Sequence, residues 1–405
     1  MLPATIDPVP LAHAMTALEL RTAGESHGPA MVCLVEGLPL GMPFDLDFVN
    51  AELRRRQRGY GRGARQRIEE DAAEVLAGVR QGRITAGPLA IAVRNQDRRL
   101  DDPVRTPPVT RPRPGHADLA GSLKFLSTDC RDVIERSSAR ETAARTAGGA
   151  AARCLLREFG IEAFGFVRGA IDVFTSARPT PENWRDLRAI RDASEVGVPD
   201  PEASERLASR IREAKEAKDT VGGLIEVHVF GAPPGLGACG AGLERLDARI
   251  GAAVLGVQAI KSVEIGMGAE VARHRGSEVH DAIRLDPARR ATSSLGFERQ
   301  TNHAGGLEGG MTNGMPIVIT AAMKPISTLL RGMPSVDLAT GEPQTSAYER
   351  SDVCAAAAAS VVLENVVAFE VARAFRAKFG GDSLAEVRAQ VDAYLAMARG
   401  LTTVP

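Results

Sequence analysis

Two histidines in glycine-containing loops are the side chains best suited to proton transfer. His27 lies in segment 24–28 (GESHG) and His116 in segment 113–118 (RPGHAD). Glycine allows a backbone to approach a ligand closely, and an imidazole exchanges protons near neutral pH. The pattern is consistent with an acid–base pair, although either histidine alone could equally have a structural role.

A cluster of arginines follows the first histidine in the chain. Positions 54–67 hold seven arginines and no acidic residue, and three glycines interrupt the run. Guanidinium groups form paired hydrogen bonds with phosphate and carboxylate, so the cluster predicts a site for a small anion. The alternative is a solvated basic surface. The segment is not a Walker loop, because no Gly-Lys-Ser/Thr sequence follows it.

Segment 135–142 (ERSSARET) has two explanations, which are compatible. Ser138 and Glu141 have the spacing of a capping box at a helix start. The same helix start, together with Arg136 and the hydroxyls of Ser137 and Ser138, would also bind a phosphate group.

Two later segments place polar groups beside regular structure. The glycine-rich segment 302–314 precedes a strand that ends at 324–328 (KPIST), which brings a cation and hydroxyls to the strand end. Asp352 lies at the start of a long apolar helix. There it would either cap the helix or act as a base facing a pocket.

The composition is that of a globular protein. Of 405 residues, 44% are hydrophobic and 25% charged, and the formal net charge is -1, which argues against a nucleic-acid partner. The five cysteines are widely spaced and no histidines have metal-ligand spacing, so we expect reduced thiols and no metal. We see no signal peptide, and the most apolar stretch, 353–369, is short for a membrane span. We therefore expect a cytoplasmic protein that contacts no membrane.

These segments require a framework of mixed strands and helices. Apolar runs predict strands at 30–38, 88–94, 222–230 and 316–323. Helical periodicity predicts helices at 47–57, 138–159, 201–218, 243–259, 352–379 and 383–399, the first capped by Asp45 or Asp47. Because strands and helices do not alternate regularly, an α+β fold is favoured over a doubly wound one. We expect residues 1–14 to be a mobile extension and 15–405 to be one domain.

In this order, the six segments and the loop at 266–281 resemble the motifs of the chorismate synthase family, across about residues 18–372. The family catalyses an anti 1,4-elimination of phosphate from 5-enolpyruvylshikimate-3-phosphate (EPSP), which gives chorismate, and the reaction requires reduced FMN. The resemblance implies a single-domain β-α-β sandwich with helices packed between antiparallel sheets. It also implies a homotetramer.

The resemblance assigns roles to individual residues. His27 resembles the histidine that protonates the departing phosphate, and His116 resembles the one that supports the protonation state of the reduced flavin. Asp352 resembles the carboxylate that assists removal of the carbon-6 hydrogen. Arg56 and Arg62 match arginines that bind anions, including the phosphate of NADP. The implied FMN contacts are Arg136, Ser137, Ser138, Gln258, Ala259, Gly309, Lys324, Pro325, Ile326, Ser327, Thr328 and Arg350.

Two other functions stay open at this point. The same arginines and flavin contacts would suit an oxidoreductase that consumes NADPH, and a non-catalytic protein could use them to bind anions. Ser327 stands where the family usually has proline, which would loosen that turn. No segment suggests a separate flavin reductase. We therefore expect reduced FMN to come from an external reductant, with NADPH as one electron source.

Overall fold

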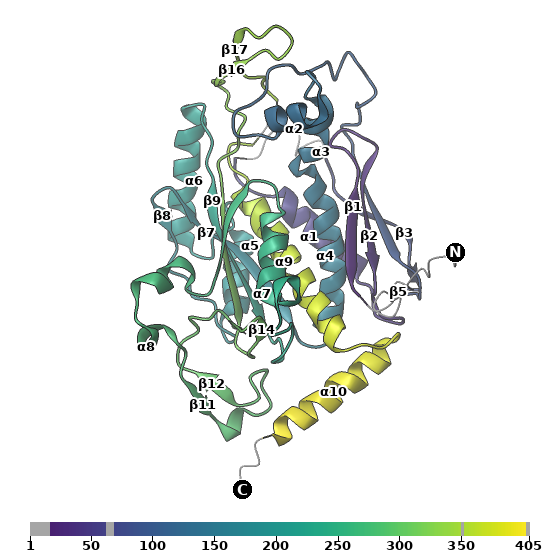
Figure 1. The fold of residues 1–405 in the computed structure, drawn as a ribbon, viewed down its shortest axis with the longest axis vertical. Helices are drawn as coiled ribbons and strands as arrows, with labels where there is room; N and C mark the ends of the chain where they lie inside the picture. Colours follow the sequence, from purple (N-terminus) through teal and green to yellow (C-terminus); the bar gives the residue numbers. More distant parts are fainter. Residues whose placement is uncertain (1–16, 62–68, 350–351, 402–405) are drawn as a thin grey trace, which may run out of the picture.

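Two antiparallel sheets enclose a layer of helices (Figure 1). The computed structural model describes residues 17–61, 69–349 and 352–401. The smaller sheet has the order β1 (Glu19–Ala23), β2 (Ala30–Glu36), β6 (Leu89–Arg94) and β3 (Ala73–Ala77). The larger sheet has the order β10 (Ile260–Ile265), β15 (Ile317–Met323), β9 (Gly223–Phe230), β7 (Glu162–Ala170) and β8 (Val173–Phe174). This arrangement confirms the α+β sandwich expected from the sequence.

The layer between the sheets consists of α1 (Leu46–Gln57), α4 (Thr142–Arg157), α7 (Leu246–Leu255) and α9 (Ala356–Lys378). α4 packs against β2 and β6 of the smaller sheet, whereas α9 packs against β7 and β9 of the larger one. α4 and α9 also pack against each other. α9 is buried on almost all sides because its sequence is apolar around the whole helix. One continuous core therefore links both sheets.

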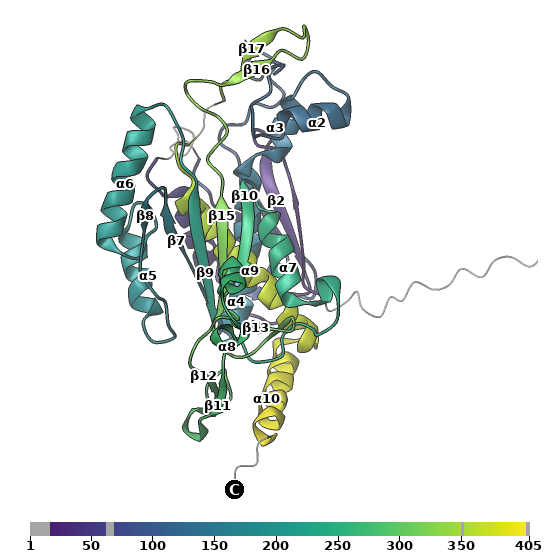
Figure 2. The ribbon, with the colours of Figure 1, turned by 60° about the vertical axis from the view of Figure 1, so that its left-hand side comes forward.

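The other elements lie outside or at the ends of the sandwich (Figure 2). α5 (Trp184–Ala193) and α6 (Pro201–Glu216) cover the outside of the larger sheet beside β7 and β8, and α10 (Leu384–Gly400) projects from one end. The opposite end carries α2 (Asp118–Phe125), α3 (Arg131–Ser137), β16 (Pro334–Val336) and β17 (Pro343–Thr345). The remaining short elements are β4 (Val79–Arg80), β5 (Arg83–Ile84), α8 (Gly276–Val279), β11 (Ile283–Leu285), β12 (Phe297–Arg299), β13 (Leu307–Glu308) and β14 (Met311–Thr312). Among the described helices, none has the length and apolarity needed to cross a membrane.

Most elements expected from the sequence are confirmed. The four predicted strands correspond to β2, β6, β9 and β15. The predicted helices at 47–57, 138–159, 201–218, 243–259 and 383–399 correspond to α1, α4, α6, α7 and α10, with ends shifted by a few residues. Asp45 caps α1, since its carboxylate accepts a hydrogen bond from the Phe48 N–H at 2.9 Å. The predicted extension, residues 1–14, lies outside the described residues.

Two predictions about helix starts are wrong. The helix predicted from position 352 begins at Ala356, so Asp352 belongs to the preceding loop. Ser138 and Glu141 form no capping box, because a short 3-10 turn at Ala139–Glu141 separates Ser138 from α4. The Glu141 carboxylate instead accepts hydrogen bonds from Thr22 Oγ1 at 2.6 Å and Arg145 Nε at 3.0 Å.

Gly149 allows α4 to approach the backbone of α9. A Cβ atom at Gly149 would lie 2.5 Å from the Asn365 carbonyl oxygen and 2.7 Å from the Asn365 Cβ. We expect Gly149→Ala to lower the free energy of unfolding by about 1–3 kcal/mol, because the helices must move apart.

The matched control for Gly149→Ala is Gly251→Ala on α7, where the nearest neighbour of a new Cβ is Val263 Cγ1 at 3.8 Å. We expect no loss of stability there, since alanine favours the helix. Urea unfolding at one protein concentration measures both variants, and equal destabilisation would contradict the argument.

Candidate active site

A cavity of about 490 Å³ lies where segments distant in the sequence converge. Its walls come from the β1–β2 loop, the α3–α4 junction, the loop before β10, the segment after β15 and the first turns of α9. Most of the predicted site residues line it: His27, His116, Asp352, Arg56, Ser137, Ser138, Gln258, Ala259, Lys324, Ile326, Ser327 and Thr328. The structure therefore brings the three expected catalytic side chains to one cavity.

The other predicted contacts lie elsewhere. Arg136 is exposed on the last turn of α3, and Gly309 lies in the turn between β13 and β14, so neither lines the cavity. Pro325 lines a neighbouring groove instead. Arg62 and Arg350 fall outside the described residues. The proposed FMN contacts of these residues stay predictions.

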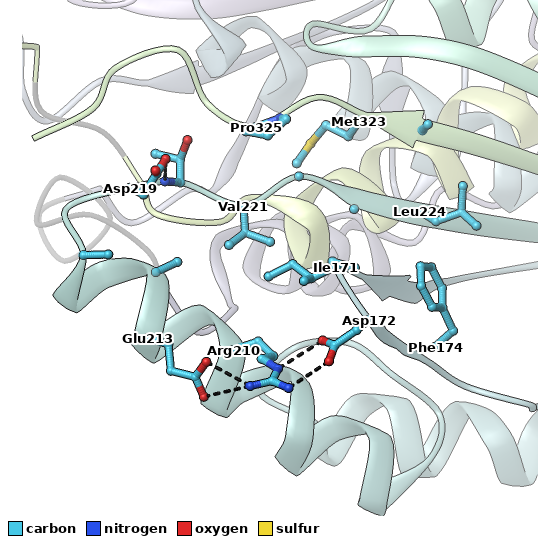
Figure 3. Close-up of a pocket in the computed structure, with 17 residues that line it drawn as sticks. Ile171, Asp172, Phe174, Arg210, Glu213, Asp219, Val221, Leu224, Met323 and Pro325 are labelled. Carbon is cyan, nitrogen blue, oxygen red and sulfur yellow. Dashed lines mark hydrogen bonds and ion pairs between the residues drawn. The ribbon is translucent and has the colours of Figure 1, made fainter. Parts of the chain in front are cut away.

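Figure 3 shows the groove next to the cavity. Met323 and Pro325 form part of its wall together with Val221 and Ile171. Below them, Arg210 of α6 forms ion pairs with Asp172 at 2.8 Å and Glu213 at 3.0 Å. Met323, the last residue of β15, lines both the groove and the cavity, so the end of this strand separates the groove from the candidate active site.

His27 is held on both sides of its ring. Nδ1 lies 2.9 Å from Oε1 of Glu135, and the His27 backbone N–H donates to Oε2 of the same carboxylate at 2.8 Å. Nε2 lies 3.0 Å from a guanidinium nitrogen of Arg99 and 3.7 Å from Asp97 Oδ2. The His27 residue is 7% exposed. Its orientation is therefore fixed before any ligand binds.

His116 pairs with a fully buried carboxylate. Its Nδ1 hydrogen bonds to Asp118 Oδ1, and Arg113 Nε donates to Asp118 Oδ2 at 2.8 Å. Burial alone would raise the pKa of Asp118, but hydrogen bonds from His116 and Arg113 hold that pKa well below its usual range. An ionised Asp118 therefore orients both the imidazole and the guanidinium.

The end of the cavity beside β15 is electropositive. Arg113 donates to Thr328 Oγ1 at 3.0 Å, and Lys324 donates to the carbonyl oxygen of Gly115. Burial lowers the pKa of Lys324, and the charges of Lys261 and Arg113 lower it further. Because the positive charges of these side chains repel one another, an anion bound at this end of the cavity would be stabilised.

The arginine cluster predicted to bind anions divides between two roles. Among the arginines described at 54–58, only Arg56 lines the cavity. Arg55 points to the interior and pairs with Glu52 at 2.6 Å and with Glu364 at 2.9 Å. Neighbouring residues on a helix point about 100° apart, so consecutive arginines cannot share one site. The prediction of anion binding by the whole cluster is wrong for Arg55.

Arg140 faces the same part of the cavity as Arg56 and was not assigned from the sequence. Its guanidinium lies 2.5 Å from Asp71 Oδ1 and donates to Asn95 Oδ1 at 2.7 Å. Asp71 Oδ2 lies 3.7 Å from Arg56. The two arginines are thus held in place by one buried carboxylate rather than by solvent.

Asp352 lies just before the N-terminus of α9. The Val353 N–H donates to Gly61 O at 2.7 Å, and Val221 N–H donates to Val353 O at 2.9 Å, which fixes this segment. Small side chains of the first α9 turns, Ala355 and Ala358, line the cavity. A helix N-terminus attracts negative charge, so this wall also suits an anionic ligand.

Sequence reasoning missed several residues that line or support the cavity. Glu135 was placed in a motif but given no role, whereas Asp97 and Arg99 lie in a long polar loop. The signal for that loop was its length and polarity, since long ordered loops in compact domains are usually functional. Within the described ranges, no cluster of three histidine, cysteine or acidic side chains could hold a metal ion.

The cavity wall contains polar atoms that fit a bound cofactor. The amide oxygen of Gln258 and the hydroxyl of Ser137 are buried and have no hydrogen-bond partner among the described residues. The Gln258 amide nitrogen donates to Glu141 at 3.2 Å, which fixes which end of the amide is unpaired. Buried polar atoms without partners are costly, so both positions suit the polar edge of a ligand.

Comparisons with known proteins identify the family of the chain. Residues 18–375 match the family model described as chorismate synthase. A protein of Geobacter metallireducens named chorismate synthase is 49% identical over 391 residues, covering 93% of this chain and 98% of that protein. One of Mycolicibacterium smegmatis with the same name is 48% identical over 395 residues, covering 93% and 96%. A crystal structure titled chorismate synthase superimposes with a TM-score of 0.77 at 36% identity, covering 96% of this chain and 100% of that one. On its sequence, its fold and its converging site, the chain belongs to the chorismate synthase family.

Proposed function

We propose that the cavity is the site of an anti 1,4-elimination that converts EPSP to chorismate. In this reaction, the last common step of aromatic amino-acid biosynthesis, phosphate leaves carbon 3 and hydrogen leaves carbon 6. The observation that carries the proposal is the convergence of His27, His116 and Asp352, from three distant segments, on one cavity. Membership of the family supports the same lyase reaction.

The charges of the cavity suit this substrate. EPSP carries two carboxylates and one phosphate, and among the described residues five cationic side chains line the cavity: Arg56, Arg99, Arg113, Arg140 and Lys324. Several of these cations already have acidic partners, such as Asp71 and Asp118. Such partners hold the guanidinium groups in a fixed geometry, so little rearrangement is required when the anion binds.

The same cavity has groups that would hold reduced FMN. Gln258 and Ser137 offer polar atoms that have no partner within the described part of the chain, and Lys324 and Thr328 offer a cation and a hydroxyl near the strand end. The chemistry supplied by bound reduced FMN is transient electron donation, which assists phosphate loss and leaves the overall reaction redox-neutral. Arg56 and Arg62 are the side chains we assign to a second anion, including the phosphate of NADPH.

The three catalytic side chains then have distinct roles. His27 donates a proton to the departing phosphate, and Asp352 assists removal of the carbon-6 hydrogen. His116, oriented by Asp118, supports the charge balance beside the flavin. General acid–base groups of this kind typically contribute about 10²–10⁴-fold each to the rate.

Gln258 provides a test of the cofactor site that needs no turnover. We expect Gln258→Leu to weaken FMN binding by about 5–10-fold, because a hydrogen bond worth about 1 kcal/mol is lost. Calorimetric titration with FMN measures the change in affinity. The control is Gln344→Leu on the exposed strand β17, which should bind FMN like the unaltered protein. Equal affinity in both variants would remove Gln258 from the proposed contacts.

The decisive experiment is an anaerobic incubation of the protein with EPSP and photoreduced FMN. We expect phosphate and chorismate in equal amounts, and none with oxidised FMN. The alternative, an NADPH-consuming oxidoreductase, predicts continuous NADPH loss with reduction of an acceptor instead. A folded protein that binds flavin but releases no phosphate would exclude the lyase function.

The proposal has three further parts that rest on resemblance to the family. Reduced FMN comes from an external reductant, the protein is a homotetramer, and it works in the cytoplasm. Light scattering after size-exclusion chromatography tests the tetramer. Anaerobic mixing of the protein with FMN and NADPH tests whether the protein reduces its own flavin. We expect the FMN to stay oxidised in this mixture, because reduced FMN has to be supplied from outside.

A further inference from the structure

The ring of His27 contacts two groups whose hydrogen-bonding roles are both fixed. An ionised carboxylate can only accept hydrogen bonds, and a guanidinium can only donate them. The Glu135 carboxylate lies 2.9 and 3.0 Å from Nδ1, and the Arg99 guanidinium lies 3.0 Å from Nε2. Nδ1 must therefore carry a proton, and Nε2 must present its lone pair.

Glu135 is well placed to be ionised. Its side chain is 1% exposed, yet it accepts hydrogen bonds from both the His27 ring and the His27 backbone N–H, and Arg131 lies 3.7 Å away. Burial alone would raise the pKa of Glu135, but the hydrogen bonds from the His27 ring and backbone, with the charge of Arg131, lower it overall. The Glu135 carboxylate is therefore expected to accept a hydrogen bond from Nδ1 and not to donate one.

We propose that Glu135 is a positioning residue that keeps a proton on Nδ1 of His27, so that Nε2 is the atom that takes up a second proton from solvent and passes it to the departing phosphate, which returns the ring to the neutral Nδ1–H tautomer. This inference rests on the proposed function for the identity of the proton acceptor. Arg99, which occupies Nε2 in the absence of ligand, must release that atom when phosphate binds. A phosphate dianion is a stronger partner for a guanidinium than a neutral imidazole is.

The charge balance around His27 supports this assignment. Besides Glu135 and Arg131 on α3, the ring faces Asp97 and Arg99 from the loop after β6. Arg99 Nε lies 3.4 Å from Asp97 Oδ1, so Arg99 retains a carboxylate partner if it leaves the ring. Both oxygens of Glu135 contact His27, and Oε1 also lies 3.7 Å from Arg131.

The first test needs neither substrate nor cofactor. Solid-state NMR of protein containing ¹⁵N-labelled histidine distinguishes protonated from unprotonated ring nitrogens. The signal of His27, one of seven histidines, is assigned by its loss in His27→Gln. We expect neutral His27 to carry its proton on Nδ1. A proton on Nε2 in the unaltered protein would overturn the proposal without any further variant.

The second test removes the carboxylate. In Glu135→Gln the amide can donate to Nδ1, so we expect the Nε2–H tautomer to appear, with Arg99 turned from Nε2 toward its other partner, Asp97. We expect kcat to fall about 10²-fold, with a far smaller change in the KM for EPSP. Glu135→Asp restores the carboxylate and should recover the Nδ1–H signal and part of kcat. An unchanged His27 spectrum in folded Glu135→Gln would also overturn the proposal.

The protein contains a matched control pair. Glu226 and His228 on β9 are also buried, and Glu226 Oε1 lies 2.6 Å from His228 Nε2, but neither residue lines the candidate active site. Glu226→Gln should alter the His228 signal and leave the His27 signal and kcat unchanged. If the unaltered protein shows the expected tautomer but no elimination of phosphate, the proposed function fails while the positioning of His27 stands.

Discussion

Replacement of His27 by alanine is expected to lower kcat for chorismate formation by about 10²–10⁴-fold, with FMN binding retained. The departing phosphate needs a proton, and Nε2 of His27, which takes up that proton before it donates it, lies next to cationic Arg99 at the cavity wall. None of the Gln258, Ser137 or Lys324 contacts proposed for FMN involves His27. The loss should therefore appear in the elimination and not in the affinity for flavin.

Single-turnover phosphate release under anaerobic conditions measures the effect of His27→Ala, and flavin titration confirms that the cofactor site is intact. The control is His228→Ala, since His228 is also a buried histidine but lies on the outer side of β9, away from the cavity. A His27→Ala protein that releases phosphate at the normal rate would exclude His27 as the general acid.

The strands that the sequence predicted are those with continuous apolar character. β2, β6, β9 and β15 lie in the middle of their sheets, between two neighbours each, and most of their residues are apolar. β7 was missed because its glycines have low strand propensity. In the structure, Gly165 is required by a close approach to α9, where a Cβ would lie 2.6 Å from Ser360 O. Such a requirement is a tertiary contact and cannot be read locally.

The sequence predicted many residues of the candidate site, but not which of them contact one another in the fold. Glycine-flanked histidines and hydroxyls at a helix start are local signals, and these residues do line the cavity. The pairing of His27 with Glu135 joins positions 108 residues apart, for which the sequence offers no periodic signal. Likewise, nothing in the run of arginines distinguishes Arg55, which is interior, from Arg56, which lines the cavity.

Arg55 belongs to a buried charge network, defined here as Glu52, Arg55, Arg153, Arg191 and Glu364, that joins α1, α4, α5 and α9. Glu364 is 1% exposed and lies 2.9 Å from Arg55, 2.9 Å from Arg153 and 3.1 Å from Arg191. Burial alone would raise the pKa of Glu364, but the three guanidinium groups hold it well below its usual range. Each buried charge of the network is therefore paired with opposite charges, which offsets the cost of burying it in the core.

Glu364→Gln is expected to destabilise the fold by about 3–5 kcal/mol, because three buried cations lose their shared carboxylate. The depressed pKa of Glu364 sets the pH range of this effect. Its stabilisation is fully present above the ordinary glutamate pKa of about 4.3 and is lost only as the pH falls through the lower, folded-state value. The difference between the unaltered protein and the variant should thus be constant from neutral pH to about pH 5 and shrink in stronger acid.

The control for Glu364→Gln is Glu74→Gln, which removes a carboxylate paired with Arg94 at 2.7 Å on the surface. Solvent and salt screen that exposed pair, so its loss should leave the denaturation midpoint almost unchanged. Urea unfolding at fixed protein concentration compares the two variants. If Glu364→Gln were as stable as Glu74→Gln, the three guanidinium groups would have to find other acceptors. In that case the network would connect the helices without determining their packing. The Gly165 N–H donates to Glu364 at 3.0 Å, and without that carboxylate the close fit of Gly165 would alone have to fix the position of β7 against α9.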